Sequence, residues 1–258
     1  MKHFCFTVDD NIRFLKEISE ASYRSIFEHP YLAMYRRMHA KYGLKIQLNL
    51  FYECDGFNLT EMTERYRDEW LLCANWLKLS FHSRTENDKP YQASGYQEVF
   101  DDCEKVHREI VRFASDCSLA KTTTVHFCLA TDEGLDALKD NGVCGLLGLY
   151  GSDINPCSSY QSTPAECEAL RHGNVVFSKE MIYAGIDIVL NRYSKEDIMC
   201  RLNALANRNF IKVMIHEQYF YPDYFRYQSD FEEKLDMTFD FLVSNGFCSI
   251  FFEEKLPQ

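Results

Sequence analysis

The feature that most constrains the fold is the regular alternation of short apolar runs with longer amphipathic ones. Runs rich in aromatic and β-branched residues at 3–8, 44–53 and 77–83 predict buried strands. The stretches between and after them have a helical apolar period, and 96–115 is the clearest of these predicted helices. About seven strands alternate with helices along the chain, and this pattern predicts parallel strands closed into an α/β barrel.

The rest of the chain continues the pattern. Further helices are predicted at 11–43 with a break near Pro30, and at 58–76, 131–142, 194–208 and 230–246. Further strands are predicted at 122–130, 143–151, 174–191 (a strand, a turn and a strand), 210–220 and 247–254. Residues 151–173 are predicted to be a surface loop. No linker or shift in composition interrupts the chain, so we expect a single domain spanning 1–258.

Composition excludes several classes of function. The formal net charge of −11 disfavours a nucleic acid or an anionic membrane as partner, because both require a basic face. No apolar run approaches the roughly 20 residues of a membrane span. The 11 cysteines are scattered, and no signal peptide is recognisable, which together favour a reducing, cytoplasmic location.

Titratable side chains gather where the predicted strands end. Asp9 and Asp10 follow the first strand, His82 ends the third, and His126 and His216 lie in later strands. In a (β/α) barrel, working groups collect at the C-terminal ends of the strands. Carboxylates and imidazoles in one pocket are the ligands that zinc and other transition metals prefer. The simpler interpretation of Asp9 and Asp10 is a helix cap with one spare charge.

The motifs around these residues resemble those of the polysaccharide deacetylases, the NodB-homology carbohydrate esterases. "FTVDDN", "LSFHSR" and "VMIHEQ" carry the resemblance. It implies a (β/α)7-type distorted TIM-like barrel. It also implies Asp9 as catalytic base, Asp10 and His82 as metal ligands and His216 as general acid. The implied cofactor is a divalent metal ion, zinc first, with cobalt, manganese or nickel as alternatives.

The chain departs from the family pattern at the third ligand. The family's second motif has a further histidine four residues after the first, where this chain has Glu86. The candidates for the missing ligand are His126 and His216, which rank level, and then Glu86; we place His126 in the metal set with Asp10 and His82. Residues near the strand ends are candidates for substrate contacts, namely Arg84, Glu86, Tyr91, Glu217 and Tyr219.

The leading hypothesis is a metal-dependent hydrolase that removes an N- or O-acyl group from a small carbohydrate. In this mechanism Asp9 takes a proton from water and His216 protonates the leaving group. A second hypothesis is a metal-free glycoside hydrolase that uses two carboxylates, such as Asp10 and Glu217. A third is a barrel that binds carbohydrate without catalysis. An aromatic-rich barrel is also compatible with a homo-oligomer.

Overall fold

The computed structural model describes residues 1–86, 91–150 and 159–256. Its strands are β1 (Lys2–Asn11), β2 (Ile46–Phe51), β3 (Glu53–Cys54), β4 (Phe57–Asn58), β5 (Leu77–Ser83), β6 (Thr122–Thr123), β7 (Gly145–Gly148), β8 (Val175–Ser178), β9 (Met181–Gly185), β10 (Ile188–Val189), β11 (Phe210–His216) and β12 (Phe247–Ser249). Its α-helices are α1 (Arg13–Glu20), α2 (Pro30–Tyr42), α3 (Arg67–Cys73), α4 (Tyr96–Phe113), α5 (Asp132–Asp140), α6 (Pro164–Arg171), α7 (Lys195–Leu205) and α8 (Phe231–Ser244).

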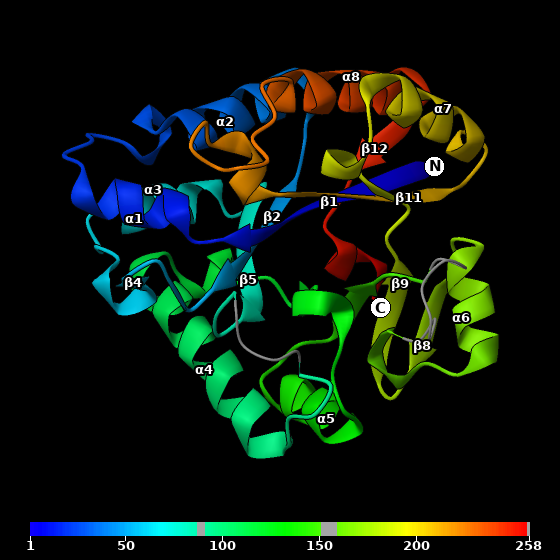
Figure 1. Ribbon diagram of the computed structural model, residues 1–258, viewed down its shortest axis with the longest axis horizontal. Coiled ribbons are helices and arrows are strands. Elements are labelled where there is room, and N and C mark those ends of the chain that lie inside the picture. Colours follow the sequence, from blue (N-terminus) through cyan, green and yellow to red (C-terminus); the bar gives the residue numbers. More distant parts are fainter. Residues whose placement is uncertain (87–90, 151–158, 257–258) are drawn as a thin grey trace.

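The strands form a distorted (β/α) barrel, which confirms the predicted fold class. One sheet has the order β10-β11-β1-β2-β5, with β12 also paired to β1, and all its pairs are parallel. A second sheet has the order β6-β7-β9-β8. The chain segments that lead into and out of the second sheet bond to the first: Ala120, two residues before β6, donates its N–H to the Leu79 carbonyl of β5, and Asp187, two residues after β9, donates its N–H to the Lys212 carbonyl of β11. Helices α2, α7 and α8 lie on one side of β1 and β11, and α4 and α5 lie on the far side of the barrel (Figure 1).

Alternation along β1 separates the outer core from the barrel interior. Phe4 and Phe6 face outward, where Phe4 stacks on Phe239 of α8 and Phe6 packs against Tyr35 of α2. Cys5, between them, faces inward, because successive side chains of a strand point to opposite faces. Cys5 accordingly packs with apolar residues of the second sheet. Further along β1, the inward-facing side chains are polar, and the candidate site begins there.

The C-terminal segment lies at the N-terminal end of the strands. β12 pairs with Lys2–Phe4 at the start of β1, and the 3-10 helix Phe252–Lys255 follows it. Glu253 forms an ion pair with Lys78 near the start of β5 and accepts a hydrogen bond from the backbone N–H of Lys121. This end of the barrel is therefore closed by the chain itself, and access is left to the C-terminal ends of the strands.

The predicted strands 210–220 and 247–254 are too long, because the strands end at His216 and Ser249 and 3-10 helices lie after them at Glu217–Phe220 and Phe252–Lys255. Three further predicted elements differ from the structure. The predicted helix 58–76 splits into a 3-10 turn (Leu59–Glu61) and α3: a capping box of Asn58 and Glu61 begins the turn, and the extended backbone of Met62 ends it. The predicted strand 122–130 is extended only at β6, since the chain turns at the 3-10 helix His126–Cys128.

The third difference concerns 151–173, which we predicted to be a loop. Residues 151–158 lie outside the described part, but Pro164–Arg171 form α6. Thr163 and Glu166 make a capping box, and Pro164 occupies the first turn. That signal was present in the sequence. None of the described helices combines the length with the hydropathy that a membrane-spanning segment requires.

Candidate metal centre

A bulge at the end of β1 brings both aspartates to the same side of the strand. Neighbouring residues of a regular strand point in opposite directions. Here the pairing of β1 with β2 shifts between Val8 and Asn11, and Asp10 has a left-handed φ of 62°. The buried Asn11 amide donates to the Val8 carbonyl (2.6 Å) and so bridges the bulge. This backbone, which is disfavoured for an L-residue, aims Asp10 at the barrel mouth.

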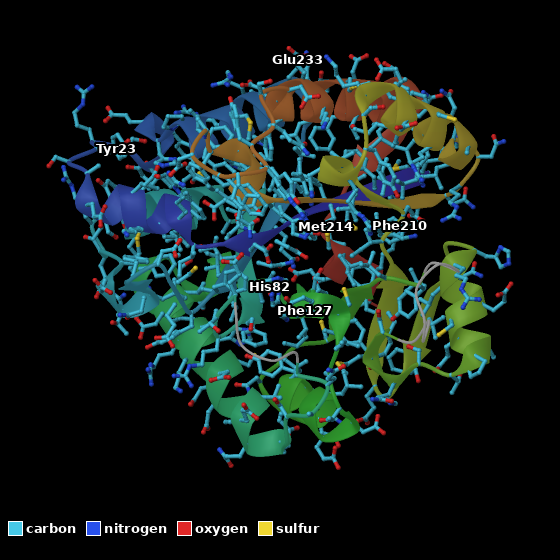
Figure 2. All side chains as sticks on the ribbon, in the orientation of Figure 1. Tyr23, His82, Phe127, Phe210, Met214 and Glu233 are labelled. Carbon is cyan, nitrogen blue, oxygen red and sulfur yellow. The ribbon has the colours of Figure 1, made fainter. Side chains whose placement is uncertain are left out.

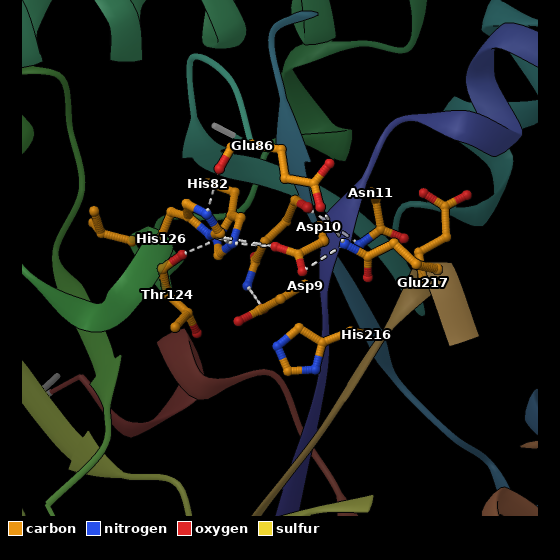
Figure 3. Close-up of polar contacts among 12 residues, drawn as sticks. Asp9, Asp10, Asn11, His82, Glu86, Thr124, His126, His216 and Glu217 are labelled. Carbon is orange, nitrogen blue, oxygen red and sulfur yellow. Dashed lines mark hydrogen bonds and ion pairs between the residues drawn. The ribbon is translucent and has the colours of Figure 1, made fainter. Parts of the chain in front are cut away.

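Asp10, His82 and His126 converge from three separate segments (Figure 3). His82 Nε2 lies 3.0 Å and His126 Nδ1 3.4 Å from Asp10 Oδ1. The two ring nitrogens lie 3.1 Å from each other. All three atoms lie within 4.8 Å of one another, a spacing that one metal ion could bridge. Figure 2 places His82 in the middle of the molecule.

The outer nitrogens of both histidines are fixed by backbone carbonyls. His82 Nδ1 donates to the carbonyl of Thr124 (2.5 Å), and His126 Nε2 donates to that of Glu86 (3.1 Å). In the neutral rings, both inner nitrogens therefore present lone pairs toward Asp10. Metal-binding histidines in proteins are held in this way. Three lone-pair donors that face one another fit a cation, and one carboxylate with two imidazoles is a donor set that zinc and its neighbours accept.

The electrostatics of the cluster favour an ionised Asp10. Burial alone would raise the pKa of Asp10, but its hydrogen-bonding contacts with the His126 and His82 rings outweigh it and hold the pKa well below its ordinary value. Burial would likewise lower the pKa of His82, but the charge of Asp9 and the hydrogen bond to Asp10 outweigh it and raise the pKa. Positive charge is therefore favoured at the position where the three ligand atoms meet.

Asp9 lies deeper than Asp10, with only 2% of its surface exposed. Its Oδ1 accepts a hydrogen bond from the side-chain amide of Asn49 on β2 (2.6 Å). Burial raises the pKa of Asp9; the charges of His82 and His216 oppose the rise, and Asp10 adds to it. A carboxylate with a raised pKa is better suited to accept a proton than one with the depressed pKa of Asp10.

His216 faces Asp9 across the β1–β11 pair, because the two residues are register partners. Its Nδ1 donates to the side-chain oxygen of Asn191 (2.9 Å), which fixes the ring and leaves Nε2 for another partner. Gln218, two residues further on, donates from its side-chain amide to Asp10 Oδ2 (2.8 Å). The second carboxylate oxygen of Asp10 is thus occupied, and Oδ1 alone faces the histidines.

Glu217 is not part of this cluster. Its carboxylate accepts hydrogen bonds from the backbone N–H groups of Ile12 (2.7 Å) and Phe14 (2.8 Å) and from the hydroxyl of Tyr221 (2.7 Å). Burial raises the pKa of Glu217 to about 7, although these hydrogen bonds oppose the rise. Helix α1 has no side-chain cap from its own N-cap residue. Glu217 therefore caps α1, and the interpretation of Asp9 and Asp10 as caps is wrong.

The other predicted substrate residues have different surroundings. The Tyr91 ring is buried, and its hydroxyl donates to Asp102 and accepts from the Arg84 backbone, so the predicted substrate contact is not open to it. The Arg84 side chain forms an ion pair with Glu53. Glu86 lines the cavity beside Asp10. It is not among the three residues whose ligand atoms converge. Tyr219 packs near His216, with ring centroids 6.2 Å apart.

A cavity opens beside Asp10 at the C-terminal ends of the strands. It is bounded by Asp10, Phe51, Glu86, Gln218 and Tyr224, among other residues. The side chain of Asp10 is 11% exposed and can be reached from this cavity, and that of His126 is 13% exposed. A three-ligand cluster next to a cavity leaves room for water and a substrate.

Sequence reasoning missed the residues that hold the cluster in place. Asn49, Asn191 and Gln218 are polar residues on or next to strands, and their partners are 40, 25 and 208 positions away. Only Gln218 carried a local signal, because it follows His216 at the end of β11. For Asn49 and Asn191, the pairing depends on the closed barrel and is invisible in a linear sequence.

Comparison with known proteins gives a fold and no family assignment. No protein-family profile matches the chain, and no curated protein sequence matches it significantly. A 4-α-glucanotransferase from Thermococcus litoralis covers 98% of this chain with a TM-score of 0.61 and 14% identity, and the chain spans 40% of that enzyme. This match supports the barrel fold.

The matching structures also include carbohydrate deacetylases. A family 4 acetyl xylan esterase from Clostridium thermocellum, solved with a cobalt ion, has a TM-score of 0.49 and 13% identity, covering 98% of this chain and 89% of its own. A peptidoglycan N-acetylglucosamine deacetylase has a TM-score of 0.47 and 11% identity, covering 98% of this chain and 86% of its own.

Proposed function

We propose that this protein is a metal-dependent hydrolase that removes an N- or O-acyl group from a carbohydrate. The observation that carries the proposal is the convergence of Asp10, His82 and His126 on one point, with Asp9 and His216 beside it. We assign the cation to the first three residues, with zinc as the first candidate and cobalt, manganese or nickel as alternatives. His126, from the turn after β6, takes the place of the histidine that the deacetylase motif has at the position of Glu86.

The residues have separate roles in this proposal. When bound, the cation would lower the pKa of water and polarise the acyl carbonyl. Asp9, held by Asn49, accepts the proton that the attacking water loses. His216, held by Asn191, donates a proton from Nε2 to the departing nitrogen or oxygen of the sugar. Glu86 and Tyr219 are the remaining candidates for substrate contacts at the mouth.

The two alternatives fare differently. A glycoside hydrolase that pairs Asp10 with Glu217 is disfavoured, because both oxygens of Glu217 are engaged by α1 and Tyr221. A carbohydrate-binding barrel without catalysis would keep the same fold and could keep the same cluster. The experiment below separates it from a hydrolase.

The test is the metal content of the protein purified without an affinity tag or chelator. Wild type is expected to hold about one transition-metal ion per chain, and His82→Ala and His126→Ala to hold far less, because each loses one of three ligands. His172→Ala is the matched control, since that side chain is 71% exposed on the C-terminal side of α6. The loaded wild type should release acetate from an acetylated sugar, and a chelator should stop it.

Two results would contradict the proposal in different ways. Absence of metal from the wild type after incubation with zinc, cobalt or manganese would remove the metal mechanism. Metal bound at one per chain with sugar affinity and no acetate release would support the non-catalytic alternative.

A further inference from the structure

Phe127 is an exposed aromatic side chain directly beside the proposed metal ligand His126. Its surface is 57% exposed, although a phenylalanine ring in water is unfavourable. The centroids of the His126 and Phe127 rings lie 4.1 Å apart, and the His126 ring also packs edge-on against Phe51 with centroids 5.1 Å apart. Phe127 thus extends the surface of the cluster outward, and Figure 2 shows it close to His82.

The backbone that presents Phe127 is unusual. Phe127 and Cys128 both have left-handed φ angles, 59° and 56°, in a turn with no glycine. The turn is fixed by a hydrogen bond from the Cys128 N–H to the Val125 carbonyl (2.7 Å) and by the Tyr160 hydroxyl, which accepts from the Val125 N–H (3.1 Å). It directs His126 toward Asp10 and Phe127 into solvent. Disfavoured backbone of this kind persists where surrounding structure holds it, and it concentrates at functional sites.

Aromatic rings also lie on the other flank of Asp10. Figure 3 places His126 on one side of Asp10 and Glu217 on the other. On the Glu217 side, Tyr221 and Tyr224 line the cavity, and Tyr224 contacts the 80% exposed ring of Phe225. A ligand that fills this cavity and also reaches Phe127 must extend across Asp10. One sugar ring at the cluster leaves Phe127 without a partner, whereas a chain of sugars does not.

We propose that Phe127 is a binding platform for a second sugar ring, so that the substrate is an oligosaccharide with the acylated ring at Asp10 and its neighbour on Phe127. The apolar C–H face of a pyranose fits an exposed aromatic face, and its hydroxyls stay in water. This inference rests on the proposed function, because it takes the ring at Asp10 as the site of deacylation. Phe127 then favours longer substrates and takes no part in the hydrolysis itself.

The experiment compares the affinity of a trimer with that of its monomer by calorimetry. The probes are tri-N-acetylchitotriose against N-acetylglucosamine, and O-acetylated xylotriose against O-acetylated xylose, with zinc-loaded protein. Wild type is expected to bind one trimer about tenfold more tightly than its monomer. Phe127→Ala should abolish that preference and leave monomer affinity, metal content and Tm unchanged, and Phe127→Trp should restore it.

Phe177→Ala is the matched control, because that ring is 63% exposed on β8, in the strand furthest from β6 in the second sheet. It should behave as wild type. The proposal is overturned if wild type shows no trimer preference in either series, including no binding at all, or if Phe127→Ala and Phe177→Ala behave alike. Failure of the proposed function has a different signature: no acetate is released or no metal is held, whereas the trimer preference and its loss in Phe127→Ala persist.

Discussion

Asp9 and Asp10 have opposite pKa shifts although they are neighbours in the chain. Asp10 is held by two imidazoles and an amide, whereas Asp9 is buried with a single amide donor among the described side chains. The pKa of Asp10 is therefore depressed and that of Asp9 is raised. Two carboxyl groups whose environments separate their pKa values are suited to different roles in one reaction. Asp10 fits a permanent ligand, and Asp9 fits a group that gains and loses a proton.

Asp9→Asn should separate catalysis from metal binding. The amide oxygen of the new side chain can still accept from Asn49, so the fold is kept, but it cannot take a proton from water. We expect turnover to fall by about 10²–10⁴-fold with metal content unchanged. The measurement is acetate release alongside metal analysis, with Asp136→Asn on the exposed face of α5 as control. Undiminished turnover would exclude Asp9 as the base.

For single residues, the sequence predicts which side chains could bind a metal better than it predicts which residues contact one another. Asp10, His82 and His126 could be proposed because each follows or ends a predicted strand and has a metal-binding side chain. Their arrangement depends on the left-handed backbone at Asp10 and Phe127, which no residue type there announces. Glu217 was a candidate for substrate contact because it follows His216. The backbone N–H groups that it binds lie more than 200 positions away.

Helix α1 depends on a residue from another element for its N-terminal cap. The Glu217 carboxylate occupies the N-terminus of α1, where free backbone N–H groups favour a negative charge. Glu217→Ala should lower the free energy of unfolding by about 2–3 kcal/mol, because it leaves buried N–H groups without an acceptor. Urea unfolding at pH 8 measures this effect. Metal content should stay at one per chain, whereas a glycosidase role for Glu217 would predict loss of activity without loss of stability.

Glu232→Ala is the matched control for this cap. Glu232 lies in the first turn of α8, and its side chain is 48% exposed and paired with Arg37. Its loss should change stability by less than about 0.5 kcal/mol. Equal effects of the two substitutions would show that Glu217 does not act as the cap of α1.

We expect His107, on helix α4 where it packs against α5, to make the free energy of unfolding fall in acid. This side chain on α4 is buried next to Cys103, and burial lowers its pKa to about 4. Since the folded-state pKa lies below the ordinary value of 6.5, the folded state binds fewer protons than the unfolded chain between these values. The contribution of His107 to the free energy of unfolding is therefore fully present above about pH 6.5. About 3 kcal/mol of it is lost as the pH falls toward 4.

His107→Leu should therefore flatten the acid limb of the stability curve. The measurement is urea unfolding at several pH values between 4 and 7 on metal-free protein, which removes proton competition at the metal site. His172→Leu is the control, because its side chain is exposed and lies outside the α4–α5 contact. Parallel curves for wild type and His107→Leu would contradict the prediction.

Helices and strands can be predicted from this sequence where apolar runs or capping residues mark them clearly. Strong strands such as β1, β2, β5 and β11 have long apolar runs, and they were located to within a few residues. β6 was predicted too long because Thr122–Ala130 has β-forming residues throughout, and only the tertiary turn at Phe127 ends it. α6 was missed because polar residues dominate its surroundings, although its capping box was visible.

In the part of the chain that the structure describes, two sheets surround one interior, and a third, two-stranded sheet pairs β3 with β4. The proposed metal ligands come from both of the larger sheets: Asp10 and His82 from the first, and His126, which follows β6, from the second. The large apolar cluster likewise contains residues of both, such as Ile46 of β2 and Leu146 of β7. We therefore propose that residues 1–258 form a single domain, as the sequence without linkers predicts. Neither sheet keeps its inner face covered when the other is removed.

This architecture predicts one cooperative unfolding transition. Trp70 and Trp76 report on the region of α3, where Trp70 packs against Phe14 and Phe113. Cys167, buried in α6, reports on the second sheet through its reaction with a thiol reagent. The urea midpoints of tryptophan fluorescence, thiol labelling and far-UV circular dichroism should coincide. Separate midpoints would mean that the second sheet opens alone, which the shared core argues against.

Metal should shift all three midpoints together. A ligand that binds only the folded state adds RT ln(1 + [L]/Kd) to the free energy of unfolding, about 2.7 kcal/mol at a hundredfold excess over Kd. Because the proposed ligands come from both sheets, opening either one breaks the site, so the increment applies to every probe. His126→Ala should remove it from all three at once. A metal shift confined to tryptophan fluorescence would mean that the cation is held by the first sheet alone, and His126 would then be excluded as a ligand.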